Sequence, residues 1–416
     1  MVREPPRPEK VKLLTGNYAA AWGARVSNVE VITAYPITPQ TTVVEKIADF
    51  VELEGMQCEY VRMESEHSVF GGAVGASIAG ARVFTATSGQ GLLYATEMVH
   101  WAAGTRLPMV VSISSRGIAP PWNIWADFSD VIAERDSGWM IQFCSTHQEI
   151  LDNIIMGYKV CEDIDVLLPL FVAYGGFELS HTSRPVVIPD QEKVDEYLPP
   201  IPEKGWPHIF LDPDRPMMHG NLIMPQGPYQ EFRMKIHEAM LGAKEKITAA
   251  TTEFKDFFGR DYGDGLVQEY RCEDADAAVI YYGGFAKQAE VAVDELREEG
   301  YNVGCIALRT YRPFPSERVV EIARRIPTLG VVDRAMAYGS PTGGPVSSDV
   351  LAAIGQARLS DRCTVLPFIA GLGGRDLTVQ EQKDQFLQVM TFKERGELPP
   401  DTLDSTVWTG LMQRGA

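Results

Sequence analysis

The chain has 416 residues, of which 45% are hydrophobic and 23% charged, so its composition excludes an intrinsically disordered protein and allows two or three globular domains. Its 38 basic and 56 acidic residues give a net charge of −18, which argues against nucleic acid or an anionic membrane surface as the main partner. No apolar run is long enough to cross a membrane and the start lacks a signal-peptide pattern, so the sequence predicts a cytoplasmic protein.

The first part of the chain, residues 1–180, alternates strand and helix patterns. The expected strands cover 29–34, 58–63, 82–87, 109–113 and 166–173. The expected helices between them cover 41–53, 68–79, 92–103 and 148–162. This spacing is typical of right-handed strand–helix–strand units on a parallel sheet.

Residues 181–258 have a different character. Ten prolines between positions 185 and 228 predict an arm or linker, and the pattern after them predicts a long helix over about 229–258.

The last part, residues 259–416, again alternates strands and helices. Strands are expected over 277–282, 303–308, 329–333 and 364–370, with helices over 287–299, 317–325, a stretch after Pro345, and 378–389. The sequence therefore predicts two α/β domains joined by a proline-rich arm.

The first candidate site follows the strand over 29–34, which ends at Tyr35 and two prolines. Pro36 and Pro39 restrict the backbone around them, so this stretch should form a stiff turn that presents Thr38 at the carboxyl end of a strand. Open α/β sheets bind ligands at that edge. A capped strand–helix turn without a ligand is the alternative.

Two more candidates follow the next two strands. Glu64, Glu66 and His67 stand at the start of the helix over 68–79, where one carboxylate could exchange a proton with a heterocycle or simply cap the helix. The turn over 85–91 has backbone NH groups that could cradle an anion or a flat ring. It lacks the spacing of either standard nucleotide-binding loop, and close helix–strand packing is the alternative.

The fourth candidate is Arg116, which follows the strand over 109–113 and precedes an aromatic loop that ends at Asp130. An arginine at a strand end suits bidentate capture of a carboxylate, and the loop could close over a ligand. The alternative is that Arg116 pairs with Asp127 or Asp130 and that the loop packs against a partner.

Two absences are informative. The six cysteines lie far apart without a CxxC pair, which excludes the usual ligand patterns for iron–sulfur clusters or structural zinc within this chain. The sequence Gly263-Asp264-Gly265 looks like the start of a thiamine diphosphate metal motif, but no asparagine follows at the expected spacing and no strand precedes it, so we interpret it as a turn. Any cofactor chemistry must then be completed by another subunit.

Several motifs in order resemble the alpha subunit of the multisubunit pyruvate (2-oxoacid):ferredoxin oxidoreductases. The matching segments are YPITPQT, ESEHS, TSGQGL, NIWADFSD, ERDSGW, LRTYRPFP and AGLGGRD, which together span almost the whole chain. The resemblance implies a thiamine diphosphate-binding domain of the pyrimidine type plus a transketolase C-terminal-like α/β domain. It also implies oxidative decarboxylation of a 2-oxoacid with coenzyme A.

The same resemblance assigns the remaining parts of the reaction to partners. Mg²⁺ and 4Fe-4S clusters are expected in beta, gamma and delta-type subunits, with ferredoxin or NAD as the electron acceptor. Two alternatives stay open: a thiamine-dependent transketolase or dehydrogenase-type enzyme without clusters, and a non-catalytic scaffold subunit.

Carried over by residue, the resemblance makes Glu66 the glutamate that hydrogen-bonds the aminopyrimidine ring and so promotes loss of the thiazolium C2 proton. Thr38 and Arg116 match positions expected to grip the substrate, and a threonine instead of a second arginine fits a monocarboxylate. We further expect Ser88, Gly89 and Gln90 beside the cofactor, and Tyr35, Asn123 and Phe128 beside the substrate.

Two segments depart from the family pattern. Phe128 stands in ADFSD where a polar residue is expected, and Val69-Phe70-Gly71-Gly72 stands where smaller or more polar residues are usual. If these side chains line the pocket, they favour a bulky or aromatic substrate such as phenylglyoxylate as a rival to pyruvate. The alternative is that Phe128 packs against a neighbouring subunit.

Overall fold

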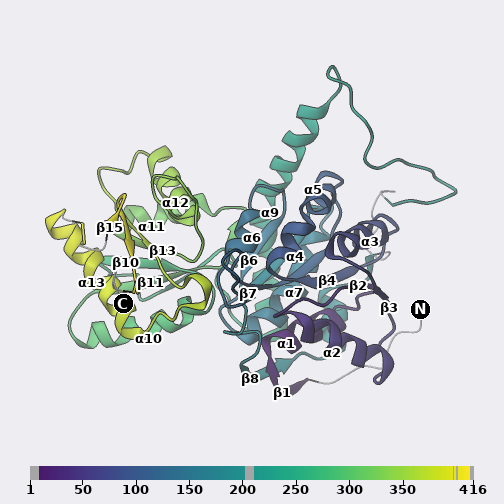
Figure 1. Cartoon of the computed structure of the whole chain (residues 1–416), viewed down its shortest axis with the longest axis horizontal. Coiled ribbons are helices and arrows are strands. Elements are labelled where there is room, and N and C mark those ends of the chain that lie inside the picture. The colour runs from purple at the N-terminus through teal and green to yellow at the C-terminus, as the bar shows by residue number, and fades with distance from the viewer. Residues whose placement is uncertain (1–8, 202–209, 397, 400–401, 413–416) are drawn as a thin grey trace.

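The computed structural model describes residues 9–201, 210–396, 398–399 and 402–412, and Figure 1 shows two α/β lobes side by side. The predicted arm is therefore described except for residues 202–209, which hold two of its prolines. Within the described residues, no helix is long and apolar enough to span a membrane.

The larger lobe is built on a seven-stranded sheet with the order β12-β6-β7-β5-β4-β2-β3. All neighbouring strands run parallel except β12, which is antiparallel to β6. The strands are β2 (Val31–Ala34), β3 (Glu59–Arg62), β4 (Val83–Thr87), β5 (Val110–Ser115), β6 (Met140–Phe143), β7 (Leu170–Gly175) and β12 (Thr310–Arg312).

Helices cover both faces of this sheet, as a buried parallel sheet requires. Alternate strand residues point into two different cores: Phe84 and Val110 lie in one cluster, whereas Val83 and Val111 lie in the other. The first cluster includes α1 (Gly16–Val26), α2 (Thr41–Glu52), α7 (His147–Cys161) and α9 (Tyr229–Phe258). The second includes α3 (Glu66–Ile78), α4 (Gly89–Tyr94), α5 (Thr96–Gly104) and α6 (Ser129–Ala133).

The smaller lobe has its own seven-stranded sheet, with the order β15-β16-β14-β13-β10-β11-β9. The strands are β9 (Val267–Tyr270), β10 (Ala277–Tyr281), β11 (Val303–Leu308), β13 (Thr328–Asp333), β14 (Thr364–Ile369), β15 (Thr402–Leu403) and β16 (Thr406–Trp408). The helices are α10 (Gly284–Glu298) and α13 (Val379–Arg395), which pack together, and α11 (Ser316–Arg325) and α12 (Pro345–Gln356), which form a second pair. The short 3-10 helix η2 (Leu372–Gly374) follows β14.

The second core cluster continues from the first sheet into the smaller lobe, where it includes Ile280, Ile306 and Val331. The two lobes therefore share packed apolar side chains, and β12 carries the chain of the smaller lobe back into the first sheet.

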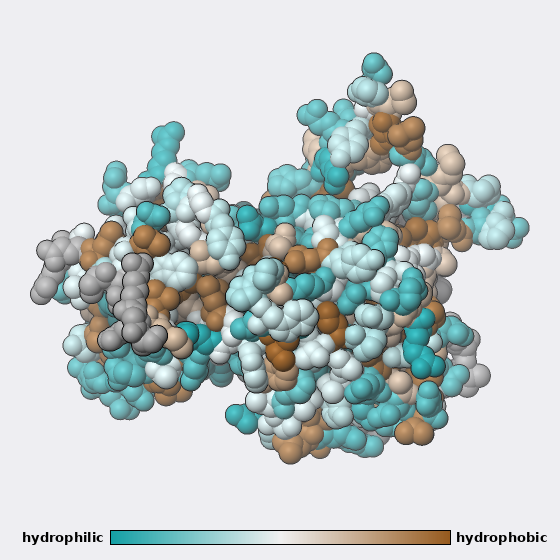
Figure 2. Space-filling model, viewed as in Figure 1, coloured by the Kyte–Doolittle hydropathy of each residue, from teal (hydrophilic) through white to brown (hydrophobic). Residues whose placement is uncertain are grey.

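The predicted arm starts as part of the larger lobe. Strand β8 (Ser183–Ile188) pairs antiparallel with β1 (Lys10–Thr15), and α8 (Gln191–Tyr197) follows. The first turns of α9 and the segment before them project beyond the rest of the molecule, and apolar side chains gather on this projection (Figures 1 and 2). Its exposed apolar residues are Leu211, Met218, Leu222, Met224, Tyr229 and Phe232.

The predicted α/β fold is confirmed, although several short strands were not predicted: β1, β6, β8, β9, β12, β15 and β16. The helix expected over 92–103 is two helices, α4 and α5. The domain boundaries at residues 180 and 258 stay a proposal, because β8 and β12 complete structures that begin in the first part of the chain.

Candidate active site

The carboxyl ends of the parallel strands β5, β4, β2 and β3 meet at one edge of the first sheet. Each candidate segment follows one of these ends: Thr38 follows β2, Glu66 follows β3, Gly89 follows β4 and Arg116 follows β5. The fold therefore brings to one edge four segments that are separated in the sequence, at the edge where open α/β sheets bind ligands.

Glu66 is the first residue of α3, whose N-cap is Ser65, with a side chain that accepts a hydrogen bond from Ser68 N at 3.3 Å. The Glu66 side chain does not lie in solvent, because only 8% of the residue is exposed. A Cβ added to Gly91 would lie 2.6 Å from Glu66 Oε1 and 2.7 Å from Thr87 Oγ1. The carboxylate therefore packs directly against Gly91 in the first turn of α4, and only a residue without a Cβ leaves room for the carboxylate there.

The two carboxylates of this segment have different environments. Glu64 is exposed and accepts a hydrogen bond from Ser68 Oγ, which lowers the pKa of its carboxyl group. Glu66 is buried, and among the described residues the structure records no hydrogen-bond donor to its carboxylate. Of the two, Glu66 is the carboxylate that is placed to meet a ligand.

The segment after β4 contains Ser88, followed by Gly89 and Gln90 in the first turn of α4. Ser88 is fully buried, Gly89 has a φ of +51°, and the Gln90 amide donates to Ala119 O at 3.4 Å. The Gly89 NH donates to Asp130 Oδ2 at 2.8 Å, so this NH is already used within the chain. The predicted backbone cradle therefore lacks one of its donors.

Arg116 lies across this turn and is only 3% exposed. Its Nη2 donates to Gln90 Oε1 at 2.9 Å, and a Cβ on Gly89 would collide with the guanidinium group. Burial lowers the pKa of Arg116, and the carboxylates of Asp130 and Glu66 oppose that shift. The side chain stays cationic at neutral pH because an arginine guanidinium loses its proton only far above neutral pH.

The alternative that Arg116 is neutralised by Asp127 or Asp130 is not what the described residues show. Asp130 accepts from the backbone NH of Arg116, at 3.2 Å, and Asp127 accepts from Ser129 N and Gly373 N, at 3.0 and 3.1 Å. The exposed Trp122 ring lies beside the guanidinium, 5.8 Å from its central carbon to the ring centroid. The cationic group is thus positioned by a glutamine and a tryptophan, and remains available to an anion.

Unpartnered polar atoms gather at the same edge. Buried side-chain atoms without a hydrogen-bond partner in the described part of the chain include Thr87 Oγ1, Ser88 Oγ, Ser114 Oγ, Ser115 Oγ and Arg116 Nε. Buried polar groups in folded proteins are nearly always hydrogen-bonded. The unpartnered hydroxyls of these segments are therefore candidates for hydrogen bonds to a polar ligand.

The turn after β2 is held by groups that the sequence does not indicate. The side chain of Asn17, fully buried in α1, donates to Pro39 O at 2.7 Å and to Thr42 Oγ1 at 2.8 Å. Tyr174 Oη donates to Asn17 Oδ1 at 2.9 Å, which fixes the amide. Thr42 is therefore an anchor, whereas Thr38 is exposed and free to contact a ligand.

Pro39 also positions this turn, because a Cβ added to Gly176 would lie 2.7 Å from Pro39 Cγ and 2.8 Å from Ser115 O. The turn thus lies against the carboxyl ends of β5 and β7. Tyr35 is half-buried, and its carbonyl oxygen accepts from Gln40 Nε2 at 2.9 Å, which stiffens the segment.

Phe128 occupies a place that its predicted role does not fit, whereas the predicted substrate contact of half-buried Asn123 stays a prediction. Phe128 has no exposed surface, and its ring packs against Phe143, Tyr282 and the guanidinium of Arg334. Asn123 donates to Gly373 O at 3.0 Å, which ties its loop to the smaller lobe. Both side chains serve packing between the two lobes of one chain, so the structure does not support a substrate contact for Phe128.

The same correction applies to the apolar pocket inferred from the segment Val69-Phe70-Gly71-Gly72. Val69 and Phe70 are buried in the core that α3 shares with the sheet, and Phe70 packs against Trp139. Both side chains are therefore core residues of the larger lobe. The preference for an aromatic substrate stays a prediction.

Replacing Phe128 by alanine is expected to lower the free energy of unfolding by about 3–5 kcal/mol, the cost of removing a large ring from a packed core. Phe128→Leu should cost less because it retains much of the apolar volume. Urea denaturation measures both changes. The ratio of activities on pyruvate and phenylglyoxylate should stay unchanged in Phe128→Leu, and a shifted ratio would return Phe128 to the substrate site.

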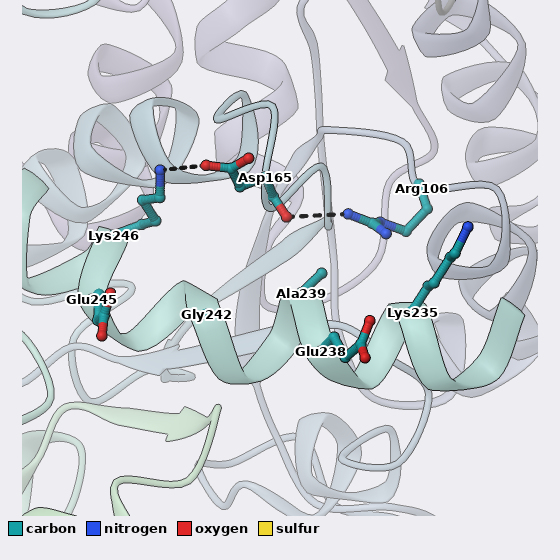
Figure 3. Close-up of a pocket in the computed structure, with 8 residues that line it drawn as sticks. All are labelled: Arg106, Asp165, Lys235, Glu238, Ala239, Gly242, Glu245 and Lys246. Carbon is teal, nitrogen blue, oxygen red and sulfur yellow. Dashed lines mark hydrogen bonds and ion pairs between the residues drawn. The ribbon is translucent and has the colours of Figure 1, made fainter. Parts of the chain in front are cut away.

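A pocket of about 410 Å³ lies at the other edge of the first sheet, beneath α9 (Figure 3). Arg106 and Asp165 in its wall precede β5 and β7, so they lie toward the amino ends of these strands. Lys246 in the same wall pairs with Asp165 at 2.9 Å. The pocket contains none of the predicted site residues, and its cations and carboxylates largely neutralise one another.

Metal-binding groups do not converge within the described ranges, where no cluster of three or more His, Cys, Asp or Glu side chains could hold a metal ion. The six cysteines are all free, and all but Cys58 are buried. The segment Gly263-Asp264-Gly265 is a turn, as predicted, in which Asp264 Oδ1 accepts from Leu266 N and Val267 N at 2.8 and 2.9 Å.

Comparison with known proteins gives the family. Residues 23–251 match the family described as pyruvate flavodoxin/ferredoxin oxidoreductase, thiamine diphosphate-binding, and residues 275–382 match the core domain II of pyruvate:ferredoxin oxidoreductase. The pyruvate synthase subunit PorA of Methanocaldococcus jannaschii is 42% identical over 97% of this chain and 99% of that protein. The ketoisovalerate oxidoreductase subunit VorA of Pyrococcus horikoshii is 41% identical over 93% of this chain and 95% of that protein.

Two solved structures support the fold. The 2-oxoglutarate:ferredoxin oxidoreductase from Magnetococcus marinus aligns with a TM-score of 0.68 at 20% identity, over 92% of this chain and 66% of that one. A split-gene transketolase, described as an inactive beta4 tetramer, aligns with a TM-score of 0.54 at 14% identity, over 90% and 98% of the two chains. The predicted combination of a thiamine-binding and a transketolase-like fold is thereby confirmed. With the two matched domains in order and relatives of 41–42% identity along nearly the full length, the chain belongs to the 2-oxoacid:ferredoxin oxidoreductase family as an alpha-type subunit.

Proposed function

We propose that this chain supplies the pyrimidine side of a shared thiamine diphosphate site, in a complex that oxidatively decarboxylates a 2-oxo monocarboxylate with coenzyme A. The observation that carries the proposal is the buried carboxylate of Glu66, which packs against Gly91 on the same sheet edge as the buried guanidinium of Arg116. The Glu66 carboxylate could accept a hydrogen bond from a protonated heterocycle, and the Arg116 guanidinium could bind the carboxylate of a substrate.

The residues at this edge fit thiamine diphosphate. Glu66 Oε1 packs against Gly91, where a Cβ would lie 2.6 Å away, so the backbone at Gly91 fixes where the carboxylate could meet a nitrogen of the aminopyrimidine ring. The unpartnered hydroxyls of Thr87 and Ser88 could hydrogen-bond the polar atoms of that ring. When bound, thiamine diphosphate supplies the carbon nucleophile and the electron sink for decarboxylation.

The protein then contributes orientation and charge. Glu66 would accept a hydrogen bond from the protonated ring nitrogen and hold that proton in a site with little water. Arg116 would bind the carboxylate of the 2-oxoacid through its free guanidinium NH groups, since its Nη2 contact with Gln90 holds it in place. Thr38, exposed on the turn after β2, would contact the substrate from the opposite side.

We further propose that the diphosphate, Mg²⁺ and 4Fe-4S clusters are held by beta, gamma and delta-type partner subunits, which pass electrons to ferredoxin or another acceptor. The relatives named PorA and VorA are themselves described as subunits. The projection on α9 and the segment before it expose an apolar surface that is typical of a contact with another protein.

The proposal extends to the kind of side chain that the 2-oxoacid carries. The curated relatives are named for pyruvate and ketoisovalerate, both aliphatic 2-oxo monocarboxylates, and one arginine with one threonine fits a single carboxylate. Because Phe128 is buried between the lobes, we favour an aliphatic substrate over an aromatic one such as phenylglyoxylate.

The test is to purify the native complex and to follow reduction of an electron acceptor with coenzyme A and, in parallel, pyruvate, branched-chain 2-oxoacids, 2-oxoglutarate and phenylglyoxylate. We expect turnover with an aliphatic monocarboxylate and little with the dicarboxylate. Iron should copurify with the complex. A complex without iron that transfers a carbon fragment instead of reducing an acceptor would replace this proposal with a transketolase-type function.

A further inference from the structure

We propose that Asp130 is a positioning residue for substrate binding: its buried carboxylate ties the turn after β4 to the end of β5 and thereby holds Arg116 in place above Gly89. The inference rests on the proposed function, in which Arg116 binds the carboxylate of the 2-oxoacid.

Asp130 lies in the short helix α6 and has no exposed surface. Its Oδ2 accepts from Gly89 N at 2.8 Å and from Arg116 N at 3.2 Å, while its Oδ1 accepts from Val131 N at 2.7 Å. Both oxygens of the carboxylate are therefore used, and all three donors are backbone NH groups.

This contact joins two segments that belong to neighbouring strands, β4 and β5. Gly89 and Arg116 also meet directly, because a Cβ on Gly89 would collide with the guanidinium group. Fixing both backbones to one carboxylate oxygen therefore sets where the Arg116 side chain leaves its strand and how it lies across the turn.

A carboxylate suits this position better than any other side chain of its size. It accepts from three NH groups at once, whereas the amide of an asparagine has one oxygen and would direct an NH₂ group at an NH donor. Burial raises the pKa of Asp130 to about 6, so the group is mainly ionised at neutral pH and also favours the positive charge of Arg116.

Asp130 positions Arg116 without occupying the guanidinium group that would bind the substrate. Asp130 takes the backbone NH of Arg116, and among the described residues no carboxylate pairs with the guanidinium itself. A direct ion pair would force the substrate to compete with Asp130, whereas a backbone contact orients the arginine and leaves its NH groups free.

The experiment compares assembled complexes that carry Asp130→Asn and Asp333→Asn. Asp333 is a matched control, because it is also fully buried and burial also raises its pKa to about 6. It accepts three hydrogen bonds at the start of α12 in the other lobe, from Val346 N at 2.9 Å, Ser347 N at 3.0 Å and Ser347 Oγ at 2.6 Å. Both variants lose a similar set of charge-assisted hydrogen bonds, but only one of them touches Arg116.

We expect Asp130→Asn to raise KM for the 2-oxoacid by about 10-fold or more, the effect of losing a hydrogen bond to a charged group, with KM for coenzyme A unchanged. The inhibition constant of oxamate, a non-reacting analogue of a 2-oxo monocarboxylate, should rise by the same factor. Asp130→Glu, which keeps the charge, should recover part of the loss. Asp333→Asn should leave all three constants unchanged.

A double-mutant comparison tests whether Asp130 acts through Arg116. In an Arg116→Ala background, adding Asp130→Asn should change the oxamate constant by less than twofold. Equal effects of Asp130→Asn in both backgrounds would overturn the inference, as would failure of both Asp130 variants to assemble while Asp333→Asn assembles. Loss of the proposed function would look different, because Arg116→Ala alone would then leave the 2-oxoacid constants unchanged.

Discussion

Replacing Glu66 by glutamine is expected to lower kcat of the assembled complex by about 10²–10⁴-fold, the contribution of a positioned proton-transfer group. The amide has almost the same size as the carboxylate, so the close approach to Gly91 is kept. What is lost is the negative charge that would hold a proton on the ring nitrogen. Steady-state turnover measures the loss, and cofactor binding by calorimetry shows whether the site is still assembled.

Glu64→Gln is the control for this variant, because Glu64 lies two residues earlier but is exposed and bonded to Ser68. Its complex should turn over at the rate of the unmodified enzyme. A Glu66→Gln complex with full cofactor occupancy and normal turnover would remove Glu66 from the chemistry and leave it as a buried residue of the α3 N-terminus.

Replacing Arg116 by alanine is expected to lower kcat/KM for the 2-oxoacid by about 10²-fold or more, since removing one partner of a buried charge pair costs roughly 2–5 kcal/mol. Most of the loss should be in KM if the guanidinium binds the carboxylate equally in the ground and transition states. The kcat/KM of the Arg116→Lys complex should lie between those of the unmodified complex and the Arg116→Ala complex. Lysine keeps the positive charge but lacks the planar guanidinium that can form two parallel hydrogen bonds. Initial rates over a range of 2-oxoacid concentrations measure these changes.

Lys246→Ala is a suitable control for the loss of a positive charge. Lys246 pairs with Asp163 and Asp165 in the pocket beneath α9, at the opposite edge of the sheet. Its removal should leave kcat/KM unchanged. If Arg116→Ala and Lys246→Ala behaved alike, the edge at β4 and β5 would not be the substrate site.

The sequence predicts well those features that depend on short stretches of chain. The prolines after β2, the small residues of α3 and the glycines after β4 each mark the end of a strand, and the structure brings these strand ends to one edge. The parallel direction of the strands, but not their order in the sheet, could be predicted from the alternating patterns. Local composition therefore indicates that Thr38, Glu66 and Arg116 lie at this edge. It does not indicate the contacts that hold these residues in place.

Other features depend on contacts between distant parts of the chain. Strand β12 has three residues and pairs with β6, about 170 positions away, so no local pattern indicates it. The loop after β5 looks exposed and aromatic in the sequence, but Asn123 bonds to Gly373, which is 250 positions away. The burial of Phe128 follows from that docking and could not be predicted before the two lobes were placed.

The anchoring residues show the same limit. Asn17 fixes the turn after β2 from α1, and Asp130 fixes Gly89 and Arg116 from α6. In the sequence Asn17 is a polar residue at a helix start, and Asp130 is a candidate partner for the Arg116 side chain. Their roles depend on backbone NH and carbonyl groups, which carry no signal in side-chain composition.

The central claim is that the edge with Glu66 and Arg116 is one half of a thiamine diphosphate site completed by a partner subunit. Calorimetric titration of thiamine diphosphate with Mg²⁺ into the isolated chain, the isolated partner and the assembled complex tests it most directly. We expect saturable, Mg²⁺-dependent binding only in the assembled complex. Binding of equal affinity to the isolated chain, or no binding to the complex, would contradict the claim.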